Sequence, residues 1–149
     1  AINSWQNNEI LEIRNPNSTR PWQHVLEPIL GYLELSIYIS EKKFKEKDLS
    51  GNSFNFGPKQ IDILTVEKVI KNFCNLWGNS KYVISKNCKF EEAVFLSLCC
   101  DKATKILNWQ PRLRIEEALL MTSDWYKEQI KSTNMYEFTI KQIEYFLSK

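Results

Sequence analysis

The residues best suited to ligand chemistry gather in one short run, Arg14-Asn15-Pro16-Asn17-Ser18-Thr19-Arg20-Pro21-Trp22-Gln23-His24-Val25. Two arginines, a tryptophan and the chain's one histidine lie there around a turn that proline stiffens. The planar guanidinium of arginine suits bidentate binding of phosphate, and an indole ring can stack on a sugar or base, or fill a core. These residues alone leave two interpretations open: an anion-binding loop, or a structural loop whose arginines pair with Glu12 or Glu27.

The remaining sequence contains no catalytic constellation. No glycine-rich turn opens a strand–helix–strand unit, so the dinucleotide-binding fingerprint is absent. No Tyr-x-x-x-Lys pair stands in a suitable setting, and His24 has no nucleophile beside it in sequence. The four cysteines form no C-x-x-C pair, so a zinc site of the usual spacing is not indicated. We therefore predict no catalytic, cofactor-binding or metal-binding residue in this chain.

The composition fits one globular domain over residues 1–149. Hydrophobic residues make up 43% of the chain and charged residues 26%, enough for a core within an ordinary surface. A net charge of +2, with acidic and basic residues mixed, argues against a nucleic-acid partner. The sequence has no apolar run of about 18 residues and no signal-like start, so we expect a cytoplasmic protein without a membrane partner. Because the chain begins at Ala1, we also expect a processed or partial chain.

Periodicity and capping residues predict a helix-rich α/β fold with two or three short strands and about five helices. Thr65 is a plausible helix N-cap and Gly78 a plausible helix stop, so the clearest helix lies between them. The other predicted helices cover residues 2–7, 26–43, 101–109, 115–131 and 135–147. Short strands are predicted at residues 10–14, 53–58 and 81–85. The aromatic stripe of the 66–77 helix, including Phe73 and Trp77, is predicted to be core.

The run from Arg14 to Pro28 closely resembles the R-N-P-x-x-x-R-P-W-Q-H-V-L-E-P motif of the CDP-glucose 4,6-dehydratase family. These proteins are NAD-dependent epimerase/dehydratases of the extended short-chain dehydrogenase/reductase type. Further matches follow in the family's order: Phe54-Asn55-Phe56-Gly57-Pro58, Thr65-Val66-Glu67, Leu76-Trp77-Gly78, Glu92-Ala93, Lys102-Ala103 and Trp109-Gln110-Pro111-Arg112. The resemblance covers nearly the whole chain, but only the C-terminal part of the family's length.

The resemblance implies a nucleotide-sugar-binding part without the N-terminal Rossmann domain that holds NAD and the catalytic groups. We therefore expect the chain alone to be inactive and to bind no NAD. The intact enzyme would convert CDP-glucose to CDP-4-keto-6-deoxyglucose. By resemblance, Arg20 would bind the diphosphate, Arg14 and Asn15 would lie near the base, and Trp22 and His24 would support the loop. Lys89 replaces the family's histidine at a site where related epimerases hold the pyrophosphate with arginine.

A second class of function remains open, a non-catalytic interaction domain descended from such an enzyme. The coding sequence upstream of Ile2 discriminates between the two. A glycine-rich fingerprint and a Tyr-x-x-x-Lys pair there would favour the dehydratase, and a start codon at this position would favour the interaction domain. The expected partners are a nucleotide sugar, with CDP-glucose first, the absent Rossmann domain, and a second copy in a homo-oligomer.

Overall fold

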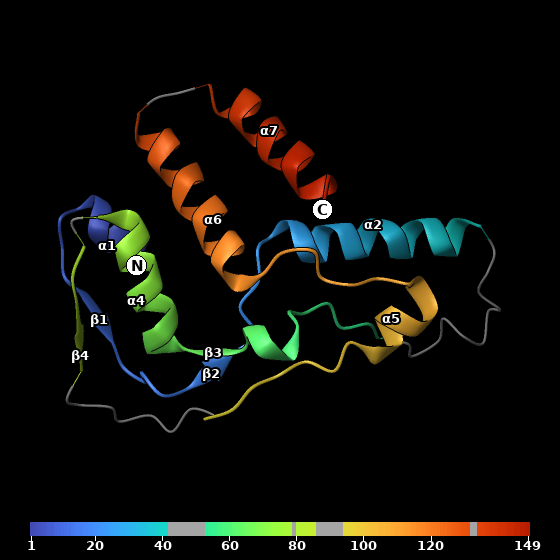
Figure 1. Cartoon of the computed structure of the whole chain (residues 1–149), viewed down its shortest axis with the longest axis horizontal. Coiled ribbons are helices and arrows are strands. Elements are labelled where there is room, and N and C mark those ends of the chain that lie inside the picture. Colours follow the sequence, from blue (N-terminus) through green and yellow to red (C-terminus); the bar gives the residue numbers. More distant parts are fainter. Residues whose placement is uncertain (42–52, 79, 86–93, 132–133) are drawn as a thin grey trace.

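The computed structural model describes residues 1–41, 53–78, 80–85, 94–131 and 134–149. Over these ranges the chain forms six α-helices and four short strands, which confirms the predicted helix-rich α/β class (Figure 1). In chain order the elements are α1 (Ile2–Gln6), β1 (Leu11–Ile13), β2 (Thr19–Arg20), α2 (Leu26–Ser40), the 3-10 turn η1 (Gln60–Asp62), β3 (Leu64–Thr65), α4 (Val66–Trp77), β4 (Tyr82–Ile84), α5 (Asp101–Leu107), α6 (Ile115–Ile130) and α7 (Met135–Leu147).

The strands form two separate two-stranded sheets. β1 and β4 are parallel, with Leu11 opposite Tyr82 and Ile13 opposite Ile84. β2 and β3 are antiparallel, with Arg20 opposite Leu64. Such short ladders present few side chains, so the helices supply most of the apolar surface that the fold buries.

The largest core cluster lies under α4, where local sequence and tertiary packing agree. The Thr65 hydroxyl accepts a hydrogen bond from the Lys68 amide at 3.3 Å, and Gly78, at φ 104°, ends the helix. Phe73 stands edge-on to the Trp5 ring, with ring centroids 5.6 Å apart. The buried members of the cluster are Trp5, Ile13, Val69, Ile70, Phe73, Ile115 and Leu119. α4, α6 and the N-terminal segment thus share one core, and Trp77 packs against it as a half-buried residue.

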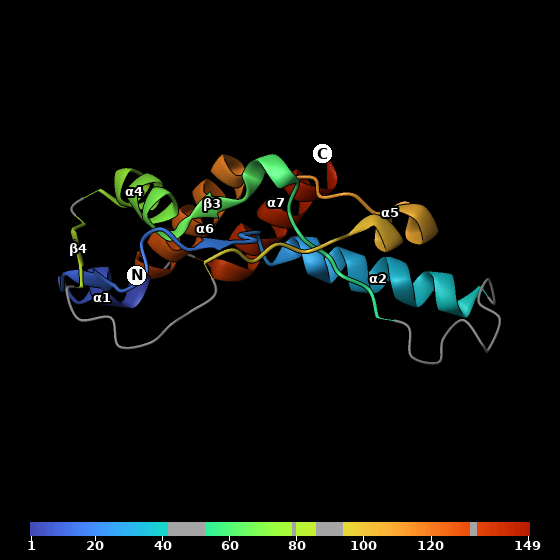
Figure 2. The same cartoon turned by 90° about the horizontal axis from the view of Figure 1, so that it is seen from below.

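Two smaller clusters fix α2, α5 and α7. Phe56, Ala103 and Trp109 form one, in which the Phe56 and Trp109 rings meet edge-on at 5.1 Å. Gly31 of α2 is packed so closely on Phe56 that a side-chain Cβ there would lie 2.6 Å from the ring carbon Cε1. The other cluster joins Leu113, Met121 and Phe146. Figure 2 shows α2 extending along one end of the molecule, away from α1, β1 and β4.

Three predicted elements differ from the structure. Residues 53–58 form no strand, because Phe56 turns into a core cluster and the segment has no ladder partner among the described residues. The helix expected to reach Trp109 ends at Leu107, where Asn108 adopts the left-handed conformation at φ 57°. α2 ends at Ser40, and its predicted end at Lys43 lies outside the described residues.

In the part of the chain that the structure describes, each helix is too short or too polar to cross a lipid bilayer.

Candidate functional site

The loop that carries Arg20 is tied to the start of α4 by backbone hydrogen bonds. The Val66 amide donates to the Ser18 carbonyl at 2.9 Å, and the Glu67 amide donates to the Pro16 carbonyl at 3.0 Å. These are N–H groups of the first helical turn, which have no acceptor inside the helix. The loop satisfies them and gains a fixed position against a rigid helix.

A second segment runs along the other side of β2. The Thr19 amide donates to the Val94 carbonyl at 2.9 Å, while the β2–β3 ladder pairs Thr19 with Thr65. Residues 94–100 continue past β2 and β3 toward α5 (Figure 1). β2 is therefore held between β3 and the segment that follows residues 86–93.

Arg20 is half-buried on β2, and its Nη1 donates to the Thr19 carbonyl at 2.8 Å. Pro21 follows directly, which favours an extended backbone at Arg20. Arg14 is exposed just after β1, and the Asn15 carbonyl accepts a hydrogen bond from the Ser18 amide at 3.2 Å, closing the turn. The structure thus places Arg14, Asn15 and Arg20 on one loop, and Lys89 lies outside the described residues.

Trp22 and His24 direct polar atoms at neighbouring backbone. The Trp22 indole donates to the Leu64 carbonyl at 3.1 Å, and its ring packs against the α4 core cluster. His24 is buried, and its Nδ1 accepts a hydrogen bond from the Leu26 amide at 3.3 Å. Burial lowers the pKa of the His24 imidazole below 6.5, so the ring is neutral at pH 7. Neither contact needs a ligand, and both fix the turn that follows Arg20.

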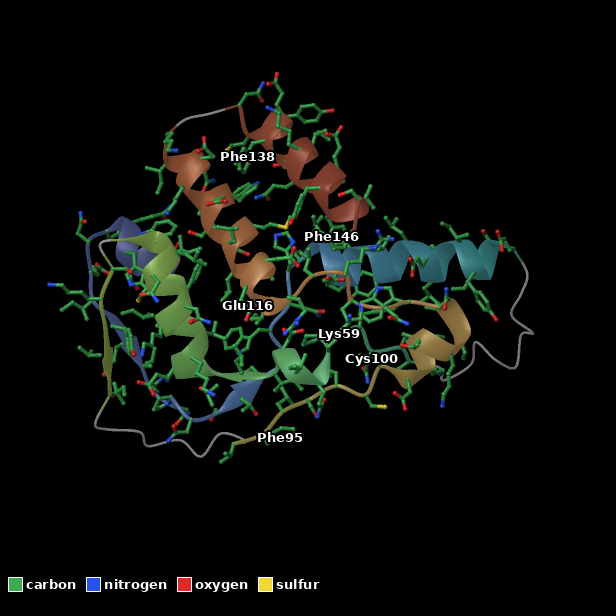
Figure 3. All side chains as sticks on the ribbon, in the orientation of Figure 1. Lys59, Phe95, Cys100, Glu116, Phe138 and Phe146 are labelled. Atoms are coloured by element: carbon green, nitrogen blue, oxygen red, sulfur yellow. The ribbon has the colours of Figure 1, made fainter. Side chains whose placement is uncertain are left out.

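The structure also contains two cavities, and the first of them is lined in part by residues 23–26. One, of about 430 Å³, is mainly apolar and lies between His24 and the aromatic rings of Trp125 and Tyr126. The other, of about 490 Å³, is more polar and is lined by Lys59, Cys100 and the end of the segment that runs past β2. Figure 3 shows Lys59 and Cys100 near this region and Phe95 on the outer edge of the same segment. Burial raises the pKa of the Cys100 thiol, so the group stays protonated at pH 7.

Sequence reasoning missed the central role of Glu27. This carboxylate is 1% exposed, and its Oε1 accepts the Arg112 amide at 2.9 Å and the Leu113 amide at 2.7 Å. It therefore joins the start of α2 to the segment before α6, and the structure gives it backbone partners instead of the suggested arginine. The sequence does show a glutamate within an otherwise apolar helical turn, which indicates a buried carboxylate. Its hydrogen-bond partners could not be predicted, because they lie far away in sequence.

No family model matches the chain. Its fold is shared with solved enzymes that act on nucleotide sugars. One is the UDP-glucuronic acid 4-epimerase of Bacillus cereus in complex with UDP-glucuronic acid and NAD, with a TM-score of 0.66 and 17% identity over 86% of this chain and 38% of that one. Another is the dTDP-glucose 4,6-dehydratase of Bacillus anthracis in complex with NAD, with a TM-score of 0.64 and 17% identity over 89% of this chain and 39% of that one. The chain therefore shares the fold of the matched part of these NAD-bound epimerase and dehydratase structures.

In sequence the chain is similar to the CDP-glucose 4,6-dehydratase of Salmonella typhimurium, strain LT2, at 35% identity over 150 residues. The match covers 99% of this chain and 40% of that protein, in its C-terminal part. The resemblance predicted from the Arg14–Pro28 run is thereby confirmed. The chain spans about two fifths of the length of the relatives it matches.

Proposed function

We propose that this chain is the nucleotide-sugar-binding part of a dehydratase similar to CDP-glucose 4,6-dehydratase. The observation that carries the proposal is the 35% identity over 99% of the chain. The nucleotide sugar binds to the loop between β1 and α2, and the N-terminal part of a longer protein contains the catalytic groups. In the intact enzyme that chemistry would convert CDP-glucose to CDP-4-keto-6-deoxyglucose.

In this proposal Arg20 binds the diphosphate, and Arg14 and Asn15 lie near the nucleotide base. Several features support it. Arg20 lies on a strand fixed on both sides, so a guanidinium there is already oriented before a ligand binds. Lys89 precedes Val94 by only a few residues, and Val94 is bonded to Thr19, beside Arg20. Lys89 is proposed as a second cation for the diphosphate from the resemblance alone, because it lies outside the described residues.

The residues of this chain do not fit NAD. A pyrophosphate on a Rossmann turn needs closely spaced glycines that let the backbone approach it at a helix N-terminus. The four glycines here, Gly31, Gly51, Gly57 and Gly78, stand far apart in sequence. Of those in the described ranges, Gly31 is packed under Phe56 inside a helix and Gly78 ends one. In the proposed enzyme NAD therefore belongs to the N-terminal part.

Replacing Arg20 by alanine in the longer protein is expected to weaken CDP-glucose binding by about 10- to 100-fold. The loss corresponds to about 1.4–2.8 kcal/mol and reflects removal of charge-assisted hydrogen bonds to a diphosphate. Arg20→Lys should recover only part of the affinity, because an ammonium lacks the planar fork. Isothermal titration calorimetry with CDP-glucose measures the effect.

The control is Lys141→Ala on α7, which removes one positive charge from an exposed position on another element. Its affinity should match that of the unaltered protein. The free energy of unfolding of Arg20→Ala should fall by only about 0.5–1.5 kcal/mol, because the hydrogen bond from Nη1 to the Thr19 carbonyl is an ordinary one. A clear loss of stability with unchanged affinity would show that Arg20 only holds the loop, and would end the diphosphate proposal.

A further inference from the structure

Two adjacent cysteines lie in the wall of the more polar cavity. Cys99 is exposed, and Cys100, which directly precedes α5, is half-buried (Figure 3). Both thiols are free, and both line the cavity of about 490 Å³ together with Gly57 and Lys59. In the described ranges of the chain, no group of three side chains suited to a metal ion includes them. The reactivity that the pair offers is therefore that of a dithiol.

The surrounding backbone holds both cysteines in place. The Cys99 carbonyl accepts a hydrogen bond from the Asn55 side-chain amide at 3.3 Å, and the Cys100 carbonyl accepts one from the Thr104 amide at 3.0 Å. The Cys100 Sγ lies over Gly57, where an added Cβ would be 3.4 Å away from it. Because Gly57 has no side chain, the thiol packs on the main chain and still borders the cavity.

The two thiols differ in what limits their reactivity. The thiolate is the nucleophile, so an exposed cysteine attacks more readily than one that burial keeps protonated. Burial raises the pKa of the Cys100 thiol, and the Sγ makes only a long hydrogen bond, to the Leu98 carbonyl at 3.9 Å. Redox-sensing sites commonly place an accessible cysteine beside a second one that resolves the first product. Here Cys99 suits the attacking role and Cys100 the resolving role.

The cavity suits a small reagent that carries both signs of charge. Its volume of about 490 Å³ lies within the range of small-molecule sites, which is about 300–1,000 Å³. Its charged lining residues are Lys59 and Asp101, which have opposite signs. A reagent with both an ammonium group and carboxylates can pair with each of them. A disulfide of a small peptide, such as oxidised glutathione, has these groups and a sulfur that a thiolate can attack.

We propose that Cys99 and Cys100 form a thiol–disulfide exchange site for low-molecular-weight disulfides of the glutathione type. This inference does not depend on the proposed function. The Cys99 thiolate attacks one sulfur of oxidised glutathione, which forms a mixed disulfide and releases one reduced glutathione. Cys100 then attacks the Cys99 sulfur and releases the second. Each released glutathione takes up the proton of the cysteine that displaced it, so two cysteines are oxidised and one glutathione disulfide is reduced.

The ring that closes between adjacent cysteines is strained, which makes the exchange reversible. Neighbouring Cα atoms lie about 3.8 Å apart, whereas disulfides usually join Cα atoms about 4.4–6.8 Å apart. Strained disulfides are easier to reduce and are the labile or regulatory ones. Closing the ring would also draw the Cys100 sulfur away from the Phe56–Ala103–Trp109 cluster, against which it packs. The oxidation state of the pair would therefore alter this wall of the cavity.

The test is treatment of the folded chain with oxidised glutathione, followed by blocking of free thiols, trypsin digestion and mass spectrometry. Trypsin cuts after lysine, so Cys99 and Cys100 fall in one peptide, residues 90–102, whereas Cys74 and Cys88 fall in other peptides. We expect the 90–102 peptide to lose two hydrogens and to regain them when reduced glutathione is in excess. A lasting glutathione adduct, a disulfide that joins this peptide to another, or no reaction overturns the proposal.

Single substitutions assign the two roles. Cys100→Ser should stop at the mixed disulfide and keep a stable glutathione adduct on Cys99. Cys99→Ser is the matched variant, and its remaining thiol should react about tenfold or more slowly, because it is half-buried. In urea the two variants should react at similar rates, since the fold causes the difference. Equal rates in the folded chain would contradict the assigned roles. Cys74→Ser, altered in the α4 cluster, should react as the unaltered chain does.

Discussion

Replacing Glu27 by alanine is expected to lower the free energy of unfolding by about 2–6 kcal/mol. The carboxylate accepts hydrogen bonds from the Arg112 and Leu113 amides and is 1% exposed, so water cannot replace it. Each buried donor left without an acceptor costs about 1–3 kcal/mol, and the substitution leaves two. Urea denaturation followed by tryptophan fluorescence measures the loss. An unchanged midpoint would show that the Arg112–Leu113 segment finds other partners.

Glu27→Gln is the matched control, because its amide oxygen can accept the same two hydrogen bonds. We expect it to stay within about 1 kcal/mol of the unaltered protein at pH 7. Burial raises the pKa of the Glu27 carboxyl above 4.5, and the hydrogen bonds from Leu113 and Arg112 only partly oppose this. The folded state therefore holds the proton more tightly than the unfolded state does. The stability advantage of glutamate over glutamine should be greatest below pH 4.5 and shrink as the pH rises through the folded-state pKa.

The Arg14–Pro28 run indicates the relatives of this chain, but it does not indicate the hydrogen-bond partners of its side chains. The run identified the relatives correctly, and its arginines suggested a ligand. Yet Trp22, Gln23 and Glu27 bond the backbone of Leu64, of Phe56, and of Arg112 and Leu113. All of these partners lie far along the chain, so no local pattern could assign the three side chains to the scaffold.

The helices that sequence reasoning placed well are those whose limits are local. Thr65 caps α4 and Gly78 ends it, as expected from their types. α7 begins and ends where its apolar period does, at Met135 and Leu147. β2 was not predicted, because a strand of two residues is too short to show an alternation of apolar and polar residues. Its pairing of Arg20 with Leu64 is also non-local. The 53–58 segment has the apolar alternation of a strand, but Phe56 packs against Trp109 instead of joining a ladder.

The candidate site was predictable in its residue types and unpredictable in its surroundings. The positions of Arg14, Asn15 and Arg20 on one loop follow from their spacing. The contact between Thr19 and Val94, which joins two residues far apart in sequence at β2, depends on tertiary structure. The apolar residues at Val25, Ile29 and Leu33 fit a core helix in sequence. The structure instead leaves these three side chains exposed.

Phe73→Ala is expected to lower the free energy of unfolding by about 3–5 kcal/mol, the usual cost of truncating a buried aromatic side chain. Phe73 is 7% exposed and lies between two tryptophans, with ring centroids 5.6 Å from Trp5 and 6.5 Å from Trp77. Neighbouring side chains cannot readily fill the cavity that the substitution leaves, because Ile115 and Leu119 of α6 close the other side of the same cluster. Asn75→Ala, exposed on the same helix, should stay within about 0.5 kcal/mol. Urea midpoints for both variants decide the matter: if Phe73→Ala unfolds where Asn75→Ala does, α4 does not turn this face to the core.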